Sequence, residues 1–295
     1  MTTQLNRWSD VSSISNSIQE DAVFAVRELG LMQRFITTFT DARGGNPRIG
    51  HVYANSGTVT TYAEADDMSS EAFAAAAAQT LTPVEIGQQF FVTDLRAESD
   101  SPDHIINDAG RELGLAANEY IEGVLFTDIA SLTGGSTIGW NIASATKVAP
   151  TWSFIAAAIS QARYVNKNTS KPLVCVIHGY SFGPLAKTAS IAGATSMAQS
   201  SDFSNQVTAG WTGLSFMGVP IYQSYAASSG TAVYGGVFPR EAIAIDWRRP
   251  IRVAPQRDES RRGIEFNMSA VLAHGVWRPE LGVKFCFDAS EPTGA

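Results

Sequence analysis

The longest helix that the hydrophobic pattern predicts spans residues 101–131. Apolar side chains recur every three to four residues from Ile106 onward, which places them on one face of a helix. Ser101, Pro102 and Asp103 supply an N-cap, a favoured first-turn proline and an acid suited to the helix dipole. At 1.5 Å per residue this helix is about 45 Å long, enough to support a sheet along its apolar face.

Two shorter helices are predicted on either side of the long one. Residues 12–30 follow a polar N-terminal segment with helical apolar spacing, and Gly30 is placed to end them. Residues 151–165 place Trp152, Ile155 and Ile159 on one face. Each segment therefore presents an apolar stripe that needs cover.

Alternating apolar and polar residues predict three strands near the C-terminus. They are centred on residues 243–247, 264–268 and 281–287. We expect them to form antiparallel neighbours in one sheet across the long helix, because both surfaces would then bury an apolar face. A further strand is expected over residues 34–43, where β-branched and aromatic residues precede a Gly-Gly-Asn-Pro break.

Residues 49–95 predict an extended hairpin excursion. Two strands, residues 49–54 and 58–62, flank an Asn-Ser-Gly turn, and a third, residues 84–95, follows an alanine-rich patch. The polar, threonine-rich composition offers little to bury within one subunit. An arm that lies on a neighbouring copy and a mobile surface loop are the two interpretations.

Charge is segregated along the 295 residues. Residues 62–128 hold 14 acids and two bases, residues 129–239 hold one acid and five bases, and residues 240–262 hold seven arginines and four acids. Complementary blocks suit contact between copies, where charge sets the register; ordinary solvated faces are the alternative. The net charge of -7 disfavours a dedicated nucleic-acid binder. A hydrophobic content of 44% indicates at least one substantial core.

One motif suggests catalysis. Residues 179–183 spell Gly-Tyr-Ser-Phe-Gly after an apolar run, which is the pattern of a nucleophile elbow that would expose Ser181. Asp246 and His274 follow in the chain order of a hydrolase triad. The βαβ units that precede such an elbow are missing upstream, so a strand-to-helix turn inside an α/β subdomain is the favoured interpretation.

The remaining chemistry is sparse. Cys175 and Cys286 lie in apolar, strand-like runs at no metal-ligand spacing, so we expect buried thiols, with no metal and no cofactor. No stretch approaches the roughly 18 apolar residues of a membrane span, and the N-terminus lacks a signal-peptide pattern. We therefore expect no membrane association.

The order of these elements resembles the Hong Kong ninety-seven phage capsid fold over nearly the whole chain. The motifs that carry the resemblance are Val92-Thr93-Asp94, Gly218-Val219-Pro220-Ile221, Arg257-Asp258 and the run from Trp277 to Phe285. The resemblance implies an α+β fold. Its parts would be an N-terminal arm and first strand (1–43), an extended β-hairpin loop (44–92), a peripheral domain with a long spine helix and a β-sheet (93–149 and 237–295), and an inserted α/β axial domain (150–236).

By this resemblance the chain is expected to be a non-enzymatic major capsid protein. It would self-assemble through hexamers and pentamers into the icosahedral head of a tailed phage, enclosing double-stranded DNA by non-specific contact. Either a separate scaffolding protein or proteolytic processing of the chain is implied. The other expected partners are a portal and a decoration protein, with assembly in the host cytoplasm and residence in the virion. An encapsulin-like nanocompartment shell protein is the alternative, and a serine hydrolase using Ser181 is the less favoured one.

Contacts between subunits are expected to join the arginine-rich block to acids of the extended loop. The candidates are Arg248, Arg249, Arg252, Arg257, Arg261, Arg262, Glu64, Asp66, Asp67 and Glu71. Charge reversal at Arg248 and Arg249 is expected to block assembly. Some relatives link subunits through a lysine of the extended loop; no lysine precedes Lys147 here, so that cross-link is not expected.

Overall fold

The computed structural model describes residues 30–41, 44–53, 59, 61–64, 66–68, 75–99, 102–135, 138, 150–167, 171–191, 215–226 and 230–291. Helices and strands are mixed, and the described strands form a four-stranded sheet, a five-stranded sheet and a two-stranded ribbon. Residues 12–29 of the helix expected over residues 12–30 lie outside the described residues.

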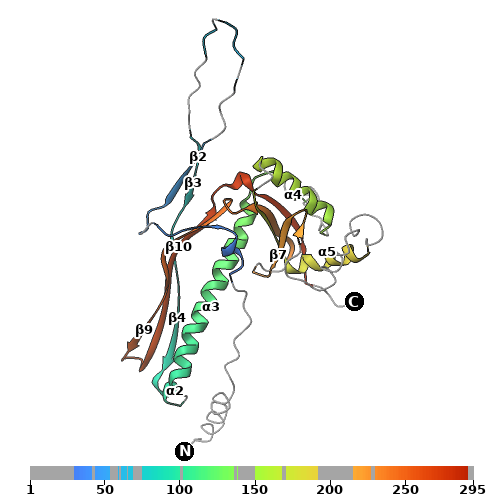
Figure 1. Cartoon of the computed structure of the whole chain (residues 1–295). Coiled ribbons are helices and arrows are strands. Elements are labelled where there is room, and N and C mark those ends of the chain that lie inside the picture. The colour runs from blue at the N-terminus through green and yellow to red at the C-terminus, as the bar shows by residue number, and fades with distance from the viewer. Residues whose placement is uncertain are drawn as a thin grey trace, which may run out of the picture.

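The four-stranded sheet has the order β1 (Thr37–Phe39), β9 (Ile243–Asp258), β10 (Gly263–Val276) and β4 (Val84–Thr93). β10 is antiparallel to β9 and to β4, whereas β1 pairs in parallel with β9. The helix α3 (Pro102–Asp128) runs beside the long strands (Figure 1). Phe266 and Met268, alternate residues of β10, pack against Leu113 and Ala117 of α3. The long predicted helix is therefore confirmed, and η2 (Ile129–Ser131) extends it.

The five-stranded sheet has the order β11 (Val283–Ala289), β8 (Gly230–Pro239), β5 (Leu173–His178), β7 (Val219–Ser224) and β6 (Ser215–Phe216). One face packs against α4 (Trp152–Asn166) and α5 (Gly179–Ile191). Phe238 and Val176 belong instead to the core that contains Ile121 and Leu125 of α3. The long helix thus shares buried side chains with both sheets.

The grouping expected for the last strand is wrong. β11 pairs with β8 in the five-stranded sheet and does not join β9 and β10. The physical reason is burial on both faces: Phe285 and Phe287 of β11 lie in the core under α4, while Cys286 between them is also buried. Alternation of residue types indicates a strand but does not say which sheet receives it.

A two-stranded ribbon, β2 (Arg48–Tyr53) and β3 (Ala75–Leu81), projects from the body (Figure 1). The strand expected over residues 58–62 is wrong, because its described residues lie outside any strand and β2 pairs with the alanine-rich patch instead. The strand expected over residues 34–43 is reduced to β1 and follows η1 (Met32–Arg34).

The base of the ribbon is packed closely. A Cβ atom at Gly50 would lie 2.3 Å from the ring of Trp277, so only glycine permits this approach of strand and indole. The Trp277 ring also meets Phe39 edge-on, with ring centroids 5.3 Å apart. Leu81, the last residue of β3, is buried in the small core that contains Ala244.

A buried ionic cluster anchors the same base to β9. Oδ2 of Asp246, a fully buried residue, accepts hydrogen bonds from Arg48 Nε and Arg248 Nη2, each at 2.8 Å. Arg48 also pairs with Asp41 through Nη2. The hydrogen bond to Asp246 raises the pKa of Arg48, and the one from Arg48 lowers the pKa of Asp41. Since Arg48 is the first residue of β2, this cluster fixes where the ribbon leaves the body.

A second polar contact joins β10 to the end of α3. Nδ1 of His274 lies 2.9 Å from Oδ2 of Asp128, and this hydrogen bond raises the pKa of His274 above its ordinary value of 6.5. The imidazolium also lies at the helix C-terminus, where a positive charge is favoured. The contact is therefore strongest when His274 is protonated.

We expect Asp246→Ala to lower the free energy of unfolding by about 3–5 kcal/mol, because it leaves the largely buried Arg248 guanidinium without its counter-charge. The control is Glu259→Ala, which removes an exposed partner of Arg257 and should cost at most about 1 kcal/mol. Urea unfolding of the original chain and of the two variants measures the loss of free energy of unfolding in each variant. Equal losses would contradict the role assigned to the buried cluster.

We expect His274→Gln to reduce the dependence of stability on pH. A pKa raised in the folded state gives stability that is fully present below the unfolded pKa and lost as pH rises through the folded pKa. The melting temperature of the original chain should therefore exceed that of the variant most at about pH 6 and least at about pH 9. A difference that stays constant between these pH values would count against the contact.

Candidate intersubunit contact surfaces

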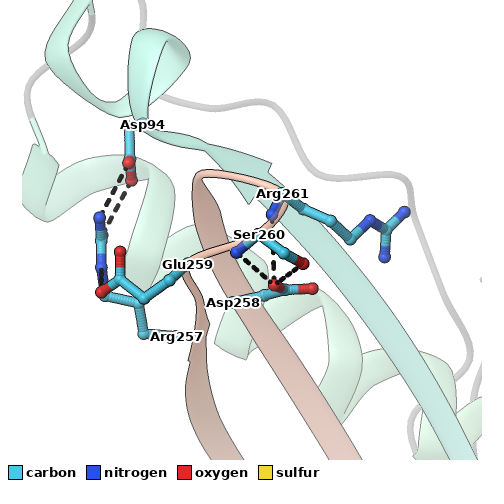
Figure 2. A network of polar contacts seen from close by, with 6 residues as sticks. All are labelled: Asp94, Arg257, Asp258, Glu259, Ser260 and Arg261. Atoms are coloured by element: carbon cyan, nitrogen blue, oxygen red, sulfur yellow. Dashed lines mark hydrogen bonds and ion pairs between the residues drawn. The ribbon is translucent and has the colours of Figure 1, made fainter.

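The β9–β10 hairpin ends in an arginine-rich tip, residues 257–262 (Figure 2). Arg257 forms a two-pronged ion pair with Asp94, the first residue of α2 (Asp94–Ser99), with Nη1–Oδ1 and Nη2–Oδ2 distances of 3.0 Å. Its Nε donates to Glu259 at 2.6 Å, and together these contacts raise the pKa of Arg257. Such a paired geometry fixes orientation as well as charge, so it ties the tip to the end of β4.

Asp258 shapes the turn itself. Its Oδ1 accepts hydrogen bonds from the Ser260 hydroxyl at 2.6 Å, from the Ser260 N–H at 2.9 Å and from the Arg261 N–H at 3.2 Å. The bond from the Ser260 hydroxyl is the largest cause of the lowered pKa of Asp258. Arg262 then adopts a positive φ of 50°, and its carbonyl accepts from the Asp94 N–H at 2.9 Å. The bonds to Asp258 and the backbone bond between Asp94 and Arg262 therefore hold the tip in one conformation.

The structure gives four of the six predicted arginines an acidic partner within the chain. The pairs are Arg248–Asp246, Arg249–Glu85, Arg257–Asp94 and Arg261–Glu265. Arg252 and Arg262 are exposed and have no acidic partner among the described residues. These two side chains are therefore the ones most available to another molecule.

The acids predicted on the extended loop lie beyond the ribbon. Glu64, Asp66 and Asp67 are exposed, and none is paired with a basic side chain in the described part of the chain; Glu71 lies outside the described residues. Asp66 accepts a hydrogen bond from the N–H of Ala63 at 3.0 Å. Nearby Met68 is 82% exposed. This segment offers negative charge and apolar surface together.

The contact between Asp94 and Arg257 was not among the predicted pairs. Its two halves do lie in motifs noted in the sequence, residues 92–94 and 257–258, which folding brings together although they are 163 residues apart. The buried cluster at the ribbon base carried less signal, because Asp246 alternates with apolar residues as a solvated strand position does.

The residues of the suggested triad are not assembled. Ser181 is buried and its Oγ donates to the carbonyl oxygen of Asp288 at 3.0 Å. In the β9–β10 register Asp246 lies opposite Ala273, so His274 points to the other face of that sheet. β5 passes directly into α5 at Gly179, and the expected strand-to-helix turn is confirmed.

The described part of the chain contains no group of three His, Cys, Asp or Glu side chains arranged to hold a metal ion, and none of its helices has the length and hydropathy of a membrane span. Burial raises the pKa of Cys175 to about 12 and that of Cys286 to about 11. Both thiols are therefore poor nucleophiles at neutral pH.

Solved structures share this architecture. The chain is 18% identical to a chain from Mycobacterium phage Che8, with a TM-score of 0.66 and coverage of 90% of this chain and 94% of that one. It is 16% identical to a chain from the capsid of Cyanophage P-SCSP1u, with a TM-score of 0.67 and coverage of 92% of each. A virus-like particle from Pyrococcus furiosus matches at 9% identity and a TM-score of 0.53, covering 94% of this chain and 96% of that one. Identities this low show a shared fold.

The family described as phage capsid protein matches residues 76–285, a range that includes α3 and strands of both large sheets. No curated protein matches the sequence. The resemblance to the Hong Kong ninety-seven phage capsid fold is confirmed at the level of fold and family. The chain therefore belongs to the phage capsid protein family and is a major capsid protein of a phage head.

Proposed function

We propose that copies of this chain close, through hexamers and pentamers, into an icosahedral head around packaged double-stranded DNA. The observation that carries the proposal is the β2–β3 ribbon, which projects from the body (Figure 1). The segment between its two strands includes exposed residues such as Met68. An isolated two-stranded ribbon is marginally stable in water, so a neighbouring copy is its natural support. Many such contacts around each copy sum to a stable particle.

The domain division expected from the resemblance is part of this proposal. Residues 1–43 form the N-terminal arm and first strand, 44–92 the extended loop, 93–149 and 237–295 the peripheral domain with α3 as its spine, and 150–236 the axial domain. The pairing of β11 with β8 supports moving the last strand into the axial domain. The ribbon lies within the proposed extended loop.

Charge pairing between copies is the second part of the proposed function. Arg252 and Arg262 would meet Glu64, Asp66 and Asp67 of a neighbour, since none of the five has an oppositely charged partner in the described chain. Arg249, Arg257 and Arg261 remain partly exposed and serve as secondary contacts. Each exposed pair contributes at most about 1 kcal/mol, so the pairs select the register between copies more than they hold it.

Assembly of this kind needs no chemical step by the chain, which supports a purely structural role. A separate scaffolding protein, a portal and a decoration protein complete the proposed set of partners. The head would assemble in the host cytoplasm and persist as the virion shell, with DNA contacted non-specifically through its phosphates. An encapsulin-like compartment is the second candidate. The match of residues 76–285 to the phage capsid protein family favours the phage head.

Particles purified from infected or expressing cells test the choice between these shells. We expect closed particles by electron microscopy, and nuclease-protected double-stranded DNA in those produced with the phage packaging proteins. Particles that instead retain a specific protein cargo and exclude DNA under the same conditions would support the compartment. A chain that stays monomeric with scaffolding protein supplied would contradict both.

Charge reversal at the two unpaired arginines tests the proposed register. We expect Arg252→Glu combined with Arg262→Glu to prevent particle formation while leaving the urea midpoint of the unassembled chain unchanged, because neither side chain has an acidic partner among the described residues. Arg248→Glu is a poorer probe, since it would place a carboxylate beside buried Asp246. Arg252→Gln with Arg262→Gln is the matched control for loss of charge. Full particle yield from the reversed variant would contradict the pairing.

A further inference from the structure

The two outer edges of the four-stranded sheet differ in composition. On one side, β1 pairs with β9 only at Ala244–Asp246, so the rest of β9 has no strand beside it among the described residues. On the other side, β4 ends the sheet along its full length. An unpaired strand edge is a template for another strand, and natural proteins block edges that must stay free.

The edge of β9 carries such a block. Pro255 lies opposite Phe266 of β10, and because proline has no N–H, this pair cannot be a hydrogen-bonded one. The Pro255 nitrogen therefore faces the open edge, where it offers no donor. A proline whose nitrogen faces the open side of a strand is a usual barrier to strand addition.

The Pro255–Phe266 pair also fixes the direction in which each backbone N–H and C=O group of β4 points. Since Phe266 does not bond to β9, its N–H and C=O bond to Phe90 of β4. By alternation, the N–H and C=O groups of Glu85, Gly87, Gln89 and Phe91 point away from β10. No described hydrogen-bond partner reaches these backbone groups.

The β4 edge also lacks the devices that blunt an edge. Within β4 there is no proline, and its single charged residue is Glu85. The register with β10 runs unbroken over ten pairs, so no bulge interrupts the row of open groups. The side chains of Gln88 and Gln89 are exposed and uncharged. An approaching strand therefore meets an uninterrupted row of open N–H and C=O groups with little charge beside it.

We infer that the β4 edge receives an extended segment of a second copy of this chain, so that the sheet continues across the boundary between two subunits. The inference deepens the proposed function and rests on it: in a shell built from one chain, the molecules that flank each copy are further copies. The block on β9 and the open ladder on β4 give the sheet one receptive side. A one-sided edge suits a head-to-tail contact between copies, as rings of subunits require.

Gln89→Pro tests the inference in the full chain, with Gln89→Ala as the matched control. The Gln89 N–H faces away from β10, so its loss should leave the urea midpoint of the unassembled proline variant close to that of the alanine variant. Both variants lose the side chain, and only proline removes the donor. We expect the proline variant to form at least about tenfold fewer particles, because a new strand pairing loses a hydrogen bond and meets the ring.

Three outcomes overturn the inference. Equal particle yields from the two variants would exclude strand addition while leaving the proposed shell intact. An unfolded proline variant beside a folded alanine variant would show that the N–H bonds within the chain. No particles from the original chain, with scaffolding protein supplied, would overturn the proposed function as well.

Hydrogen exchange on the unmodified chain gives an independent measurement. Amides of Gly87, Gln89 and Phe91 should exchange fast in the unassembled chain and at least about tenfold more slowly in particles. The Phe90 amide, already bonded to β10, should be slow in both. Equal rates for the three outward amides before and after assembly would overturn the inference.

Discussion

Burial of α3 against two sheets is the constraint on which the other features depend. Its middle packs on Phe266 and Met268 of the four-stranded sheet through Leu113 and Ala117. Ile121 and Leu125, further along the helix, share a core with Val176 and Phe238 of the five-stranded sheet. Each large apolar side chain buried there contributes roughly 1.5–3 kcal/mol. Both sheets are therefore positioned by one element, and so are the ribbon and the arginine-rich tip that extend from them.

Polar contacts then join segments that are distant in sequence to this frame. Arg48 and Asp246 are 198 residues apart, Arg257 and Asp94 are 163 apart. Both oxygens of the buried Glu122 carboxylate accept from the N–H of Met32, at 2.8 and 2.9 Å, which fixes the chain 90 residues upstream. Two acids of the acidic block, Glu85 and Asp94, thus meet arginines of the arginine-rich block, Arg249 and Arg257, inside one copy.

How far the sequence predicts this fold depends on the kind of signal. The long helix and the strands β9 and β10 are predictable because their apolar periods are strong and local. β3 was missed because alanine has little preference for strands, and its pairing with β2 depends on the base of the ribbon. The family was predictable from the order of elements. The partners of individual arginines were not, since charge blocks say nothing about which pairs meet within one copy.

The contact between Gly50 and the Trp277 ring sets the angle at which the ribbon leaves the body, and this angle determines where the far end of the ribbon lies. The three residues of β2 beyond Gly50 span about 10 Å, so a tilt of about 10° at this contact would displace the far end of the strand by roughly 2 Å, most of a hydrogen-bond length. The absence of a single methyl group at residue 50 therefore governs how accurately a distant surface is aimed. An error in the angle between the ribbon and the body at this contact would be repeated in each copy and would change the curvature of the shell.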